Sequence, residues 1–188
     1  MRLRRCALAA CLIFLPVLWL STWILAPAES TWLELTDAGT GRRIASQLLS
    51  DGQRVVLTWK NSLFDLPVTE VFVAGKGILT LTEITFADPM GREAPRVRPK
   101  DVDDLYQTGG PFKAEGLSRP VSRVTFRIGE IGHPVIRVGS HVIHLAGEVG
   151  FGGAVLLTAR PASLYERTVG GFFAGETHSM NGQAADHS

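Results

Sequence analysis

Residues 55–72, with the sequence VVLTWKNSLFDLPVTEVF, decide the fold of this chain. Both halves of the stretch are rich in β-branched and aromatic residues, and the second half alternates between polar and apolar positions as a half-buried strand does. Asp65-Leu66-Pro67 lies between the halves, and a proline, which has no N–H, favours a turn or a strand edge. The stretch therefore predicts two antiparallel strands, 54–62 and 68–74, joined as a hairpin with a broad tip.

The strand pattern continues on both sides of this hairpin. Residues 78–86 (ILTLTEITF) alternate throughout, which predicts a third strand with Thr82, Ile84 and Phe86 on one face and Leu79, Leu81 and Glu83 on the other. Further strands are predicted at 31–36, 121–128, 134–138, 141–145 and 154–159, whereas 44–49 fits either a strand or one helical turn. Short strands between glycine-rich and proline-rich turns predict an all-β domain, either a single antiparallel sandwich or a small barrel.

Two regions interrupt the pattern. Residues 88–118 are rich in proline, glycine and mixed charges, which predicts a long loop in which 101–106 adds one helical turn. After Pro161 the apolar signal fades, and the chain ends in Gly, His, Asn, Gln and Ser. Such a polar composition buries too little surface to offset the entropy of ordering. We therefore predict a β domain at 29–163 and a flexible C-terminal tail at 164–188.

The chain begins with a candidate membrane segment at 1–28. Arg2, Arg4 and Arg5 precede an uncharged run, 6–26, that would extend about 30 Å as a helix, which matches the hydrocarbon core of a bilayer. The arginines favour the cytoplasmic side, so the body would be exported. We expect an inner-membrane protein with a single transmembrane helix and its body in the periplasm.

The leader has two possible fates. Its length, and Trp19 and Trp23 near its outer end, favour an uncleaved anchor. Ala26-Pro27-Ala28 instead fits the small-residue pattern of a signal peptide, and cleavage after Ala28 would release the body into the periplasm.

Composition excludes several kinds of site in the exported body. Both cysteines, Cys6 and Cys11, lie in the leader, so the body has no disulfide, thiolate metal site or thiol nucleophile. The leader also holds three of the 19 basic residues, which leaves the body with fewer basic residues than its 18 acidic ones. This balance argues against a nucleic-acid partner, which requires clustered cations.

Catalytic and metal-binding patterns are absent from the sequence. His141 and His144 are an odd number of residues apart, so on a strand they point to opposite faces and cannot share an ion. Serines such as Ser62 have no Gly-x-Ser-x-Gly context. We therefore expect no metal, no cofactor and no enzymatic activity, with a hydrolase that uses Ser62 or His133 as the least favoured alternative.

The hairpin carries the residue types of a binding site. Trp59 and Asn61 share a strand face, and Ser62 and Asp65 lie towards the tip, with Glu70 on the second strand. Amide, hydroxyl and carboxylate groups beside an aromatic wall can bind a small molecule or a protein. The alternative, which these residues alone favour, is that the Asn, Ser and Asp side chains cap the backbone of their own turn.

The same hairpin resembles the opening motif of a family of uncharacterised exported domains. In that family an aromatic residue is followed by His-Ser, an acidic residue, Pro-Val, Glu and a second aromatic residue. The residues of this chain that match are Trp59, Ser62, Asp65, Pro67, Val68, Glu70 and Phe72, with further similarity at 81–86, Gly132-His133 and Leu145. The resemblance covers approximately residues 33–157. It departs from the family at Asn61, where the family has His, at Asp65, where it has Glu, and over 88–95.

Members of this family are commonly encoded beside TAXI-type TRAP transporters, which import small organic acids with a separate binding protein. The resemblance implies an accessory, non-enzymatic protein, anchored by residues 6–26, whose partner is the membrane subunit of the transporter or its binding protein. It adds His133 to Trp59, Asn61, Ser62, Asp65 and Glu70 as candidate contact residues. An alternative is a domain that binds a small carboxylate, with Arg123 or Arg127 as the counter-charge.

Overall fold

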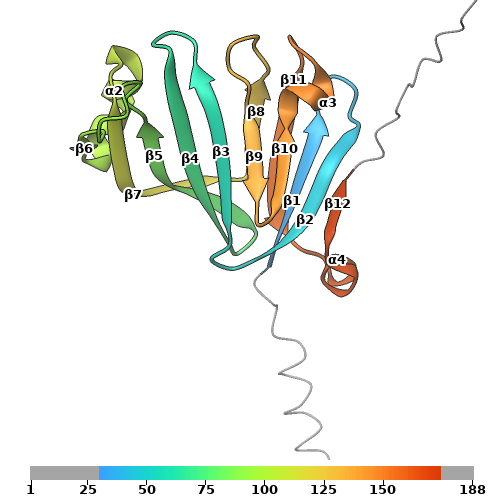
Figure 1. Ribbon diagram of the computed structural model, residues 1–188. Coiled ribbons are helices and arrows are strands. Elements are labelled where there is room, and N and C mark those ends of the chain that lie inside the picture. The colour runs from blue at the N-terminus through green and yellow to red at the C-terminus, as the bar shows by residue number, and fades with distance from the viewer. Residues whose placement is uncertain (1–29, 175–188) are drawn as a thin grey trace, which may run out of the picture.

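The computed structural model describes residues 30–174, and strands dominate this part of the chain (Figure 1). The predicted all-β character of the domain is therefore confirmed. The predicted leader at 1–28 lies outside the described residues, as does the end of the predicted tail. None of the helices within residues 30–174 is long and apolar enough to cross a lipid bilayer.

The strands form two sheets. The first contains, in spatial order, β12 (Phe172–Ala174), β2 (Arg43–Ser50), β1 (Ser30–Asp37), β11 (Ala154–Pro161) and β8 (Arg123–Arg127). The second contains β10 (His141–His144), β9 (Val135–Val138), β3 (Arg54–Asn61), β4 (Leu66–Gly75), β5 (Ile78–Phe86), β7 (Phe112–Val121) and β6 (Arg96–Val97). Neighbouring strands are antiparallel except for β6 and β7, which are parallel.

Between residues 30 and 174, four short helical segments connect the strands. They are the 3-10 helix η1 (Pro99–Asp101), α2 (Val102–Thr108), α3 (Leu145–Val149) and α4 (Leu164–Val169). The helical turn predicted at 101–106 is confirmed by α2, and the ambiguous segment 44–49 is the strand β2.

The long loop predicted at 88–118 is wrong over its second half. Phe112 starts the ten-residue strand β7, which pairs with β5 along its length, and Pro120 lies within that strand. The alternation of β7 is interrupted because its pairing with β5 shifts in register: Leu81 pairs with Arg119, whereas Glu83 pairs with Glu115. An interrupted period hides a strand from a sequence-based search.

The two faces predicted for residues 78–86 are also wrong. Leu79, Leu81, Ile84 and Phe86 are all buried, although an unbroken alternation would place the first pair and the second pair on opposite faces. The register with β4 shifts at this point, and Thr82 donates a hydrogen bond to the backbone oxygen of Val71 (3.1 Å). This β-bulge inserts one residue and returns the apolar side chains to the same face.

The inner face of the seven-stranded sheet is covered in two places. One core cluster combines its residues, including Val55, Leu57 and Leu79, with Leu33 and Val155 of the five-stranded sheet. A second cluster packs the other part of that face, around Phe86, against Val102 of α2 and its neighbours. Trp59 packs against both clusters, so it lies at the boundary between them.

The ordered sheets continue past residue 163, where we expected the β domain to end. The helix α4 follows β11, and β12 then pairs with β2 at the edge of the five-stranded sheet. These elements are only six and three residues long, which is too short for a helical or strand period to appear in the sequence.

Candidate ligand-binding cleft

The predicted hairpin forms, but its tip lies earlier than expected. Leu66 and Pro67 already belong to β4 and pair with Asn61 and Lys60, so the turn consists of residues 62–65. Trp59 pairs with Val68, and Glu70 pairs with Leu57 on one side and Ile84 on the other. The regular alternation of β4 thus places the Glu70 carboxyl on an otherwise apolar face.

Glu70 is held by two aromatic side chains. The hydroxyl of Tyr106 on α2 donates a hydrogen bond to its carboxyl oxygen (3.0 Å), and the indole N–H of Trp59 donates a second. Burial raises the pKa of Glu70, and these two hydrogen bonds oppose that rise in part. The pKa of Tyr106 is also raised, because its hydroxyl is buried and lies beside the Glu70 carboxyl. The carboxyl at this position therefore retains a proton more readily than an exposed glutamate does.

An aromatic cluster fixes the orientation of these two donors. Phe86 lies at its centre, 4.7 Å from the ring of Phe112 in a stacked arrangement. Tyr106 and Trp59 meet Phe86 edge to face, with ring centroids 5.2 and 6.4 Å away. Such pairs contribute about 0.5–1.5 kcal/mol each beyond their buried area. The hydrogen-bonding groups around Glu70 are thus positioned by packing.

Trp59 and Glu70 line a cleft between the two sheets. This cleft has a volume of about 360 Å³, and its other walls are residues 124–127 of the edge strand β8, with Gly132 and Pro134 from the loop before β9. The cleft lies on the inner face of the seven-stranded sheet, between the part that packs against the five-stranded sheet and the part that packs against α2. A concave, largely apolar site with a few convergent polar groups is typical of small-ligand binding.

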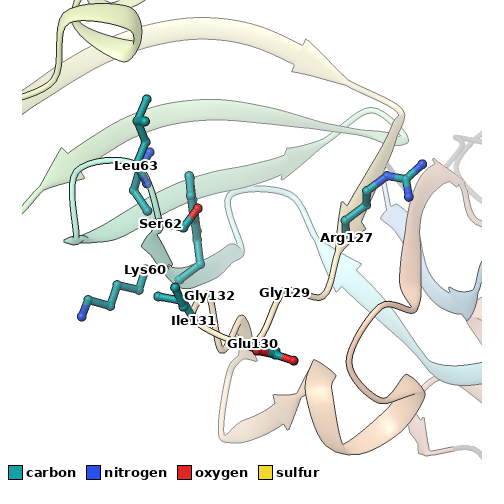
Figure 2. A pocket seen from close by; sticks show the side chains of 10 residues that line it. Lys60, Ser62, Leu63, Arg127, Gly129, Glu130, Ile131 and Gly132 are labelled. Atoms are coloured by element: carbon teal, nitrogen blue, oxygen red, sulfur yellow. The ribbon is translucent and has the colours of Figure 1, made fainter.

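A second cavity of about 570 Å³ opens at the hairpin tip and shares Trp59, Arg127 and Gly132 with the cleft. Figure 2 shows Ser62 and Leu63 of the tip on one side of this cavity, Arg127 on another, and Glu130 and Ile131 on the β8–β9 loop. Arg127 has no ion-pair partner within residues 30–174. Its side chain is exposed and lines both spaces, and Figure 2 shows it directed away from the hairpin tip.

Three of the predicted contact residues have mainly local roles. The amide oxygen of Asn61 accepts hydrogen bonds from the backbone N–H groups of Leu63 (2.9 Å) and Phe64 (3.0 Å), which is the local capping that the sequence favoured. Asp65 has a left-handed backbone (φ 56°), is mostly exposed, and forms an ion pair with Lys60 (2.6 Å). Ser62 is exposed in the turn and lines the outer cavity.

His133 lies in the β8–β9 loop, also with a left-handed backbone (φ 39°). Its neighbours Gly132 and Pro134 line the cleft, whereas its ring packs edge-on against Phe151 at 5.9 Å. The structure therefore brings Trp59 and Glu70 together on the floor of the cleft and leaves Asp65 and His133 at its periphery. No cluster of His, Cys, Asp and Glu suited to a metal occurs in the described part of the chain.

Sequence reasoning missed Tyr106. It named Arg127 only as one of two possible counter-charges, and Arg127 is the one that lines the cleft beside Trp59. Tyr106 is an aromatic residue in a segment otherwise rich in charge, which is a weak signal of burial. Its partner Glu70 is 36 residues away in the chain, so only the fold reveals the pair.

Comparisons with protein-family models, curated proteins and solved structures found no match to this chain. Its function is therefore inferred from the cleft and from the sequence.

Proposed function

We propose that this chain is a membrane-anchored, extracytoplasmic binding module without enzymatic activity, and that its ligand is a small organic acid. The cleft carries this proposal, because Trp59, Glu70 and Arg127 converge there from three different strands. Arg127 supplies a positive charge for a carboxylate of the ligand. Glu70, whose protonated form is favoured by burial, supplies a hydrogen-bond donor for a second ligand oxygen.

The proposal includes a sandwich-like architecture for the body. It is supported by the core cluster that combines buried residues of both sheets, and by the turn between β4 and β5. In that turn the backbone N–H of Gly77 donates a hydrogen bond to the hydroxyl of Thr31 on the first sheet (3.1 Å).

Ligand binding can be tested by thermal unfolding of the full-length chain in detergent, in the presence of di- and tricarboxylates. At a ligand concentration about 100-fold above Kd, a ligand that binds only the folded state stabilises it by about 2.7 kcal/mol, and the melting temperature should rise. Arg127→Gln should abolish the rise. Arg137→Gln is a matched control, because Arg137 is an exposed arginine on β9 outside the residues that line the cleft.

A rise in melting temperature that survives Arg127→Gln would show that carboxylates bind elsewhere. The absence of any rise across the carboxylates would contradict the binding proposal itself.

A second candidate function is that of an accessory subunit of a TAXI-type TRAP importer, as the family resemblance implies. It is favoured by two exposed apolar residues on the rim of the outer cavity, Leu63 and Ile131, which are typical of a protein contact. Affinity purification of the chain from its native membranes should recover a transporter membrane subunit or its binding protein. Leu63→Asp combined with Ile131→Asp should lose that partner, and repeated purification without any transporter subunit would contradict this role.

A further inference from the structure

The short helix α4 exposes its apolar residues. Leu164, Tyr165 and Val169 are 76%, 73% and 41% exposed, whereas the side chain of Glu166 is only 14% exposed. With 3.6 residues per turn, residues 164, 165, 168 and 169 share one face of the helix, and 166 and 167 lie on the opposite face. A helix on the surface of a soluble domain normally has the reverse arrangement, with its apolar stripe towards the core.

This orientation is fixed by specific contacts. Glu166 forms an ion pair with Arg160 at the end of β11, and one of the two hydrogen bonds between them measures 2.8 Å. Ser163 and Glu166 also form a reciprocal capping box at the start of the helix. The ion pair and hydrogen bonds of Glu166 hold the charged face of α4 against the sheet, so Leu164 is directed outwards. Tyr165 and Val169 are also exposed, and they line an open groove of about 490 Å³ beside Trp32 and Arg43.

The helix lies beside the point where the chain enters the described domain. Thr31 of β1 pairs with Pro161, and the backbone N–H of Ala162 donates a hydrogen bond to the oxygen of Ser30 (3.0 Å). Residues 27–29 alone separate Ser30 from the apolar run 6–26, so Ser30 lies within about 14 Å of the end of that run. Figure 1 shows α4 at the end of the molecule where β1 begins, opposite the β3–β4 tip.

We propose that α4 is a membrane-contact element, whose residues Leu164, Tyr165 and Val169 enter the interface of the bilayer in which residues 6–26 are anchored. Apolar residues of an interfacial helix lie at the boundary between headgroups and acyl chains, and tyrosine is enriched at that depth. The inference rests on the membrane anchor of the proposed function. A membrane contact at α4 also sets the orientation of the domain. β1 extends about 26 Å from Ser30. The cleft lies near the other end of the strands and is therefore on the side away from the membrane.

The depth of α4 can be measured by spin labelling of the full-length chain in vesicles of phosphatidylethanolamine and phosphatidylglycerol. In a Cys6→Ser, Cys11→Ser background, a single nitroxide is attached at Leu164→Cys or, on the same face, at Tyr165→Cys. Leu63→Cys at the β3–β4 tip is the matched control, because Leu63 is 75% exposed. The ratio of oxygen accessibility to nickel-chelate accessibility should be several-fold higher at positions 164 and 165 than at 63.

Equal accessibility ratios at the three positions would overturn the membrane contact. Protection of position 164 from both reagents, with spectral broadening from neighbouring labels, would also overturn it and identify a second copy of the chain as the occupant. Extraction of the same samples with alkaline carbonate separates the two proposals. Release of the chain would contradict the anchor itself, whereas retention with a water-exposed α4 would contradict only the membrane contact.

Discussion

Glu70 is the residue on which the candidate site depends. A carboxyl group on an apolar sheet face costs free energy unless it is protonated or hydrogen-bonded, and here both Tyr106 and Trp59 donate to it. A domain that needed only stability would be served by an apolar residue between Leu57 and Ile84. The hydrogen bonds and the open cleft beside the carboxyl together favour a role in binding.

We expect Glu70→Gln to change how stability depends on pH. Burial raises the pKa of Glu70 in the folded state, so within the window between the unfolded and folded pKa values the folded chain binds the proton more tightly. The wild type should therefore lose stability relative to the variant as pH rises through that window, by at most about 1.4 kcal/mol per pH unit. Denaturant unfolding of both proteins across this pH range measures the difference.

Glu115→Gln provides a control of opposite sign. A hydrogen bond from Lys113 lowers the pKa of Glu115, so the stability that this carboxylate contributes is lost as pH falls through its folded pKa. If Glu70→Gln and Glu115→Gln changed the pH profile in the same direction, the assignment of Glu70 as a buried, proton-retaining carboxyl would be wrong.

Turns and bulges position the elements that form the cleft. The bulge at Thr82 keeps Leu79, Leu81, Ile84 and Phe86 on one face, so a single strand contributes to both core clusters. The turn between β4 and β5 joins the sheets, because Gly77 contacts both Thr31 and Pro161 of the five-stranded sheet. Such contacts hold the two sheets together at the end where β1 begins.

We expect Gly77→Ala to be considerably more destabilising than Gly52→Ala. Both glycines have left-handed backbones, with φ of 78° and 81°, so both substitutions share a conformational cost of about 1–2 kcal/mol. A Cβ at Gly77 would also overlap the backbone nitrogen and ring of Pro161, whereas a Cβ at Gly52 meets no atom within 4 Å. This overlap should add about 1–3 kcal/mol, which urea unfolding can measure. Equal losses for the two variants would indicate that the turn does not dock against β11.

At the scale of the whole molecule, one sheet face supports two cores, and the cleft lies between them. The cluster between the sheets and the cluster under α2 share Trp59, which also donates to Glu70. Because Trp59 lines the cleft and packs against both clusters, the shape of the cleft is coupled to their packing. The exposed apolar residues of α4 lie at the opposite end of the molecule.

We expect both sheets to lose stability together when the shared core is weakened. Leu79→Ala removes a fully buried side chain from the cluster between the sheets and should cost about 2–5 kcal/mol. Hydrogen exchange should report the same loss for amides in β11 and in β3, which belong to different sheets. Leu63→Ala, at an exposed position, should change stability by less than about 0.5 kcal/mol. A loss confined to the strands around β5 would show that the sheets unfold independently.

The sequence by itself determined the all-β class, the hairpin around Trp59 and Glu70, and most of the strands. These features follow from alternating polarity and turn residues, which are local properties of the chain. The residues alone also favoured local capping by Asn61 over its role as a candidate contact residue, and its amide oxygen does accept from the backbone of its own turn.

The tertiary structure alone decided which distant residues meet. The bulge at Thr82 and the strand β7 depend on pairing across the sheet, and the bond between Tyr106 and Glu70 joins residues that are far apart in the chain. The cleft itself exists because the five-stranded sheet and α2 each cover only part of one face. Long-range pairing and incomplete coverage depend on the packing of all the elements together, so no local pattern in the sequence reveals them.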